Sequence, residues 1–255
     1  MPPRALALAN VAFEAGAWDT TLVYARWAYS GSNVRAVAGA ALILAARAWE
    51  ALGRPDSAFA QYDAVFDRWT DPGSVSPEAH FRRASLLESL GQWERARAEF
   101  AALTAAAPSH PLALEATLRV VNHHLRAGEF ELARVEGGNG LDRMAYLLAT
   151  NRDPQVQRLA GLAHGQLLLT LGYTARAEST LVDLWRRFPE DSAAEAAALR
   201  GASLAEHRPG GRASAAALYD ELATHASHLA IRRQAEARLA ELAPAAAPSR
   251  KEVRR

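Results

Sequence analysis

The feature that most constrains this chain is a six-residue phrase that recurs along nearly its whole length. In its four clearest copies the phrase begins with glycine and ends with alanine, as in Gly91-Gln92-Trp93-Glu94-Arg95-Ala96. Weaker copies lie near both ends, and a near-constant period of this kind is typical of repeat architectures. The glycines that open the six copies are Gly16, Gly53, Gly91, Gly128, Gly172 and Gly210, spaced by 37, 38, 37, 44 and 38 residues.

Each copy of the phrase has the properties of a turn between two helices. Its glycine can adopt the left-handed conformation that ends a helix, because it has no Cβ atom. A small residue such as Ala96 lets the next helix lie close to its neighbour, and Phe100 and Leu103 follow it at i+4 and i+7 on one helix face. Pro108 then stops the helix. The repeat therefore predicts a series of helical hairpins.

These hairpins resemble the tetratricopeptide repeat, whose pattern has glycine at the turn, alanine early in the second helix, an aromatic residue four positions on, and a closing proline. The segment from Phe81 to Pro108 matches this pattern best, through Gly91 and Trp93 among others. The resemblance implies an all-α fold, a right-handed α-solenoid of about six hairpins with a C-terminal capping helix, over residues 1–242.

Composition and periodicity favour helix in every repeat. Alanine, leucine, arginine and glutamate dominate, and no run of β-branched residues alternates over the length of a strand. The expected helix pairs are 4–14 with 19–30, 34–51 with 56–69, 77–90 with 94–107, 111–127 with a broken partner, 153–170 with 174–188, and 192–207 with 212–226, followed by a capping helix at 228–242.

Two segments depart from the pattern. The 44-residue interval contains Gly137-Gly138-Asn139-Gly140, and three glycines in four residues predict a loop there, followed by a helix near 141–150. The last residues, 243–255, are rich in alanine and proline and then basic. They offer too little apolar surface to order themselves, so we expect a disordered tail or a linker.

The sequence offers little chemistry for an enzyme. It contains no cysteine, no Gly-x-Ser-x-Gly elbow and no His-Glu-x-x-His helix. His225 and His228 are three residues apart, but no third ligand falls at metal-binding spacing near them. The Gly137–Gly140 segment follows a helix and has no lysine, unlike a phosphate-binding loop. The sequence thus predicts no catalytic residue, metal site or cofactor.

Charge and hydropathy limit the partners. The net charge is +1, which gives no overall field to attract nucleic acid. No stretch approaches the ~18 apolar residues needed to cross a bilayer, so we expect no integral membrane segment. The first residues are a poor secretory signal, and the compartment stays open between bacterial cytoplasm and periplasm. Abundant alanine and arginine, with Lys251 as the only lysine, are typical of a high-GC bacterial genome.

The resemblance also implies a binding surface, because in this family the first helix of each hairpin lines a concave groove. Arginine and amide side chains there can hold an extended peptide or its carboxylates. The alternative is that these arginines are solvated and paired with Glu50, Glu88 and Glu115. Counting from the turn glycines, the predicted groove residues are Arg47, Arg82, Arg119, Asn122, Arg126, Gln166, Arg200 and Arg208.

The function expected from the resemblance is that of a non-catalytic scaffold or adaptor, which binds a protein or peptide partner in the groove. The repeats also resemble those of bacterial cell-envelope proteins, which points to envelope assembly. Two alternatives remain open at this stage: a sensory or regulatory module of a larger enzyme or transcription factor, and an enzyme with a site in the groove. The partner and the oligomeric state are not specified by the sequence.

Overall fold

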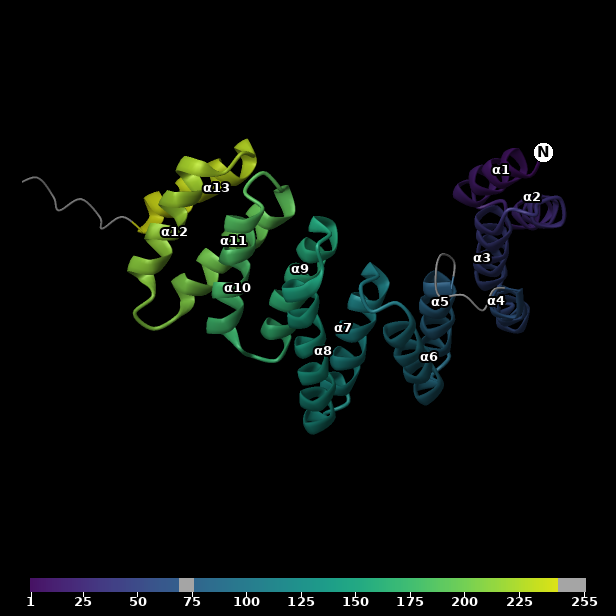
Figure 1. Cartoon of the computed structure of the whole chain (residues 1–255), viewed down its shortest axis with the longest axis horizontal. Coiled ribbons are helices and arrows are strands. Elements are labelled where there is room, and N and C mark those ends of the chain that lie inside the picture. The colour runs from purple at the N-terminus through teal and green to yellow at the C-terminus, as the bar shows by residue number, and fades with distance from the viewer. Residues whose placement is uncertain (69–75, 243–255) are drawn as a thin grey trace, which may run out of the picture. The chain divides into compact units, whose positions relative to one another are not determined.

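The computed structural model describes residues 1–68 and 76–242, which form thirteen α-helices and no β-strand (Figure 1). Two compact units divide the chain, Met1–Gly128 and Glu129–Arg255. The helices of the first unit are α1 (Pro2–Glu14), α2 (Trp18–Ser30), α3 (Arg35–Ala51), α4 (Pro55–Arg68), α5 (Ser76–Ser89), α6 (Trp93–Ala106) and α7 (Pro111–Arg126). Those of the second are α8 (Phe130–Thr150), α9 (Pro154–Thr170), α10 (Thr174–Arg187), α11 (Ser192–His207), α12 (Arg212–His225) and α13 (Leu229–Leu242).

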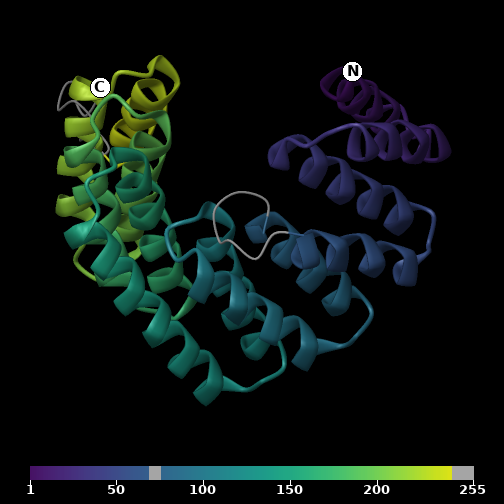
Figure 2. The same cartoon turned by 45° about the vertical axis from the view of Figure 1, so that its right-hand side comes forward.

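Within each unit, consecutive helices pack as antiparallel pairs (Figure 2). Apart from the segment around Gly137, the helix ends lie within two residues of the predicted ones. The predicted capping helix is present as α13, which packs on α12 and α11. The prediction of an all-α, tetratricopeptide-like stack of helical hairpins is therefore confirmed in the described residues. The predicted tail, 243–255, lies outside them.

The turn glycines have the conformation that the repeat predicts. All six have a positive φ, from 67° at Gly53 to 81° at Gly172, and no other residue in the described part does. At Gly91 the backbone N–H donates to the carbonyl of Glu88 over 3.0 Å, and the next N–H donates to Leu87 over 2.9 Å. These two bonds use carbonyl groups that the end of α5 would otherwise leave without a partner.

The alanine that ends each phrase lets neighbouring helices approach closely. Ala58, Ala96, Ala133, Ala177 and Ala215 are all completely buried. A larger side chain four residues later fills the core beside four of them. These side chains are Tyr62, Phe100, Leu181 and Tyr219, each no more than 4 % exposed.

The predicted loop at Gly137–Gly140 is wrong, because α8 runs through it as one helix of 21 residues. The second helices α4, α6, α10 and α12 have 14 residues, so the extra length of this repeat extends the helix by seven residues. Seven residues are almost two full turns, which keeps the same face towards the core. Gly137 is buried, and a Cβ atom there would lie 2.7 Å from a methyl carbon of Leu171. Close packing therefore offsets the low helix propensity of glycine.

None of the described helices combines the length and the apolarity that crossing a bilayer requires.

Candidate functional site

The first helices of successive hairpins lie closer together than the second helices do. Cα atoms approach within 8 Å between α1 and α3, α3 and α5, and α5 and α7 in the first unit, and between α9 and α11 in the second. No two successive second helices within a unit approach this closely in residues 1–68 and 76–242. Elements on the inside of a curved stack are the closer ones, so the first helices form the inner face of each unit.

A cluster of three charged residues links α5 and α7 on the inner face of the first unit. Arg119 Nε lies 3.6 Å from one carboxylate oxygen of Glu88, and Arg126 Nη2 lies 3.6 Å from the other. Both distances exceed a hydrogen bond, so these ion pairs are loose. The structure thus brings together two of the predicted groove arginines, and the cluster carries one more positive than negative charge.

The two arginines differ in how firmly they are held. The guanidinium of Arg119 donates to the hydroxyl of Ser85 and lies 5.3 Å from the centre of the Phe81 ring. Arg126 donates to the backbone carbonyl of Asn122 over 3.2 Å, yet its side chain is 71 % exposed. One cation is therefore fixed against the wall, and the other projects into solvent beside the exposed Asn122.

Ser85 and His123 complete this cluster, and sequence analysis did not name them. Glu88 was expected only in the alternative in which it pairs with these arginines, and the structure shows that pairing. His123 stacks on Trp93 with ring centres 3.4 Å apart and planes 4° apart, and its Nδ1 lies 3.9 Å from Glu88. Glu88 stands three residues before its turn glycine, as Glu50 does. Glu88 meets arginines of the next first helix, α7, whereas Glu50 meets Tyr62 of its own hairpin.

Arg47 and Arg82 lie on the same face of the first unit but have other contacts. Arg47 lies 4.2 Å from the centre of the Phe13 ring, and Arg82 pairs with Glu78 over 3.4 Å. Both are close enough to Tyr62 to oppose the rise of its pKa, which burial causes first and the hydrogen bond to Glu50 second. Glu50 thus accepts from a tyrosine hydroxyl at 2.5 Å rather than pairing with a groove arginine.

The second unit holds the remaining predicted residues. Arg200 on α11 donates to the side-chain carbonyl of Gln166 on α9 over 2.7 Å, which joins two first helices. Arg208 follows α11 and pairs with Glu178 on the second helix α10 over 3.2 Å. Arg200 therefore donates to an uncharged amide oxygen, whereas Arg119 and Arg126 lie beside the charged carboxylate of Glu88.

No group of three or more histidine or carboxylate side chains is arranged to hold a metal ion within the described residues. His228 contacts Glu195, which is completely buried, through a 2.8 Å bond at Nδ1. Glu195 also accepts the backbone N–H groups of Ser227 and His228, just before α13 begins. Buried carboxylates require such donors, so this contact is a helix cap and a packing device.

No protein-family model matches the sequence, and no curated protein matches it. Among solved structures, the chain is similar to a tetratricopeptide repeat protein from Parabacteroides merdae, with 16 % identity, a TM-score of 0.47, and coverage of 93 % of this chain and 85 % of that one. It is also similar to the C-terminal part of a TPR repeat-containing protein from Cytophaga hutchinsonii, with 14 % identity, a TM-score of 0.45, and coverage of 94 % and 95 %.

This chain has a tetratricopeptide-repeat fold. The hairpins, the six left-handed turn glycines and the buried alanines of its own structure carry that statement. A third similar structure, a thermophilic TPR protein from Thermus thermophilus, has 20 % identity and a TM-score of 0.44, and the match covers 79 % of this chain and 99 % of that one.

Proposed function

We propose that this chain is a non-catalytic scaffold that binds an acidic, extended segment of a partner protein along the inner face of its first helices. The main contact is the stretch Arg119, Asn122 and Arg126 on α7. The remaining predicted groove residues extend the surface within each unit: Arg47 and Arg82 in the first, and Gln166, Arg200 and Arg208 in the second.

The observation that carries the proposal is the excess of guanidinium groups over carboxylates around Glu88. Neither contact to Glu88 is short enough for a hydrogen bond, so both guanidinium groups keep N–H groups that can donate to a partner's carboxylate. A guanidinium that is already held by Ser85 and Phe81 loses little freedom when it binds. Asn122 adds an exposed amide that can donate to and accept from a peptide backbone.

The test is selection from a library of unstructured 12-residue peptides on the full chain. Selected peptides are then measured by fluorescence anisotropy on wild type and on the variant Arg119→Ala/Asn122→Ala/Arg126→Ala. We expect enrichment of aspartate and glutamate. The triple variant should bind at least about ten-fold more weakly, because two charge-assisted contacts are lost.

A matched control removes the same charge from a second helix. Arg95→Ala/Arg97→Ala takes two exposed arginines from α6 and should leave the affinity within about two-fold of wild type. Circular dichroism should show equal helicity in all three proteins. Selected peptides without acidic residues, or equal affinity for the triple variant, would contradict the proposal.

A further inference from the structure

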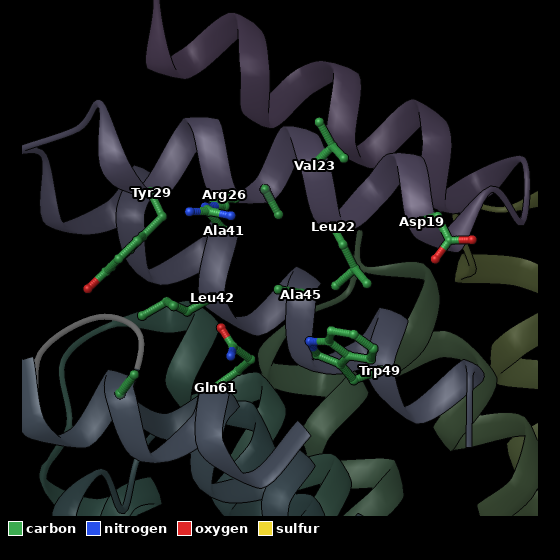
Figure 3. Close-up of a pocket in the computed structure, with 12 residues that line it drawn as sticks. Asp19, Leu22, Val23, Arg26, Tyr29, Ala41, Leu42, Ala45, Trp49 and Gln61 are labelled. Atoms are coloured by element: carbon green, nitrogen blue, oxygen red, sulfur yellow. The ribbon is translucent and has the colours of Figure 1, made fainter. Parts of the chain in front are cut away.

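A pocket of about 670 Å³ lies between α2 and α4 in the first unit, over α3 (Figure 3). Its two walls are second helices, so it does not belong to the inner face described above. We call it the α2–α4 groove. The lining is mainly apolar, with Leu22 on the α2 wall and Leu42, Ala45 and Trp49 on the α3 floor.

Two of the α3 residues that line the floor are small, which leaves space between the flanking helices. Ala41 and Ala45 are buried beneath it, and an alanine side chain cannot fill the space between two flanking helices. The α4 wall is also low, because Ala64 faces the groove together with Gln61. Small residues on a helix face allow a further helix to approach closely.

The apolar surface continues beyond the pocket along α2. Val23 lines the groove and is 49 % exposed, and Trp27, one turn further on and outside the lining, is 59 % exposed. Tyr24 packs edge-on against Trp27 with ring centres 5.5 Å apart, which holds the indole in place. A small ligand inside the groove would leave this tryptophan in water, whereas a macromolecular partner would cover it. Exposed tryptophan is enriched where proteins bind one another.

Two opposite charges stand on the same wall. Asp19 and Arg26 line the groove, and neither has a hydrogen-bond or ion-pair partner in the described part of the chain. They are seven residues apart on α2, which is about 10 Å or two helical turns. A guest helix that lies along α2 would present side chains at the same spacing.

We infer that the α2–α4 groove binds an amphipathic α-helix of a partner protein. The guest has an apolar stripe at i, i+3, i+4 and i+7, which covers Leu22, Ala45 and Trp49 inside the groove. Its flank contacts Trp27, which lies outside the lining. It carries a basic and an acidic residue two turns apart, which face Asp19 and Arg26. The walls have 13 and 14 residues, so a guest of three to four turns spans the groove. This site is on a different face from the proposed peptide site, and neither depends on the other.

The experiment uses a displayed library of 14-residue, helix-stabilised peptides, selected on the full chain. Enriched peptides are expected to show the apolar stripe and opposite charges seven residues apart. Their affinity is measured by fluorescence anisotropy on wild type and on Ala64→Leu, which places a larger side chain in the groove. We expect binding to Ala64→Leu to be at least about ten-fold weaker, and binding to Trp27→Ala about five-fold weaker.

The control is Ala101→Leu, which adds the same side chain at an exposed position of the second helix α6, outside the groove. It should bind the peptides as wild type does, and so should Arg119→Ala/Asn122→Ala/Arg126→Ala. Circular dichroism confirms that each variant is folded. Equal affinity of Ala64→Leu and Ala101→Leu for the selected peptides would overturn the inference, and so would enrichment of peptides with no helical pattern.

Two other occupants would give distinct results. If the groove holds a small apolar molecule, the dye anilinonaphthalene sulfonate binds wild type and not Ala64→Leu, while no helical peptide is enriched. If a second copy of this chain occupies it, sedimentation shows a wild-type dimer that Ala64→Leu dissociates, again with no peptide enriched. Either result would overturn a partner helix as the occupant.

Discussion

The α2–α4 groove has an equivalent in the second unit, and the two differ greatly in size. The equivalent pocket lies between α8 and α10 over α9 and has a volume of about 250 Å³, against 670 Å³ for the α2–α4 groove. The two floors are in the same register. Leu42 precedes its turn glycine by 11 residues and Ala45 by 8, as Gly161 and His164 do. The repeat sets where a pocket forms, but its volume is set by other residues.

The floor glycines of α9 explain the difference. A Cβ atom at Gly161 would lie 2.5 Å from a methyl carbon of Leu184, and one at Gly165 would contact Leu181. The leucines of α10 therefore insert where α9 has no side chain, and they fill most of the space. At the position of Gly165 the first unit has Ala46, and Tyr62, at the register of Leu181, belongs to the same buried cluster as Ala46.

The largest effect on stability is expected when Gly161 of the second unit is replaced by leucine, the residue that the first unit has at this register as Leu42. Gly161→Leu should destabilise the protein by about 3 kcal/mol, because Leu184 already fills the space. The double variant Gly161→Leu/Leu184→Ala should be at least about 1 kcal/mol more stable than the sum of the two single losses predicts. Urea unfolding of the wild type, both single variants and the double variant, followed by circular dichroism, measures these free energies. Strictly additive losses would show that this leucine does not fill the floor.

The close packing of α8 in the second unit is tested by two of its adjacent glycines. Gly138 has no neighbour within 4 Å of a Cβ position, so Gly138→Ala should stabilise the helix by about 1 kcal/mol. Gly137→Ala should instead destabilise by about 1 kcal/mol, because its methyl group displaces Leu171. Thermal unfolding of the two variants measures the difference. Equal shifts of Tm would contradict the close packing of α8.

The third difference is that the floor of the second-unit pocket has a histidine, His164, where the floor of the α2–α4 groove has Ala45. Burial, and then the charge of Arg176, lower the pKa of His164, whereas Ala45 stands at this register in the first unit. Below about pH 6.5 the His164 imidazole is protonated more readily in the unfolded chain than in the folded one. The free energy of unfolding therefore decreases as the pH falls from about 6.5 towards the pKa of the folded state. His164→Ala should reduce this loss, which cannot exceed about 1.4 kcal/mol per pH unit. Unfolding from pH 5 to 8 tests it, and an unchanged pH slope would contradict it.

The smallest effect concerns the two inner faces. In the first unit Arg119 and Arg126 meet a carboxylate, and in the second Arg200 meets the neutral Gln166. Glu88→Gln makes the first face resemble the second and removes the negative charge beside both guanidinium groups. Acidic peptides should then bind about three-fold more tightly, or about 0.6 kcal/mol. Weaker binding of these peptides in anisotropy would show that Glu88 positions the arginines rather than competing with the ligand.

The helical hairpins and much of their core were predictable because the signals are local. A glycine at each turn, an alanine five residues later and an aromatic or leucine four beyond that describe one helix face. The same locality explains the error at Gly137–Gly140. Helix propensity counts each glycine as unfavourable, whereas Leu171, more than thirty residues away in sequence, occupies the space that a side chain would need.

The sequence by itself determined the repeat, the turns and the order of the helices, because hydrogen bonds and side-chain spacing within a few residues decide them. Only the tertiary structure decided which charge meets Arg119, how far α2 and α4 stand apart, and which glycines lie inside a helix. These depend on side chains that are distant in sequence and meet only when helices pack, where one methyl group more or less decides whether a space is open or filled.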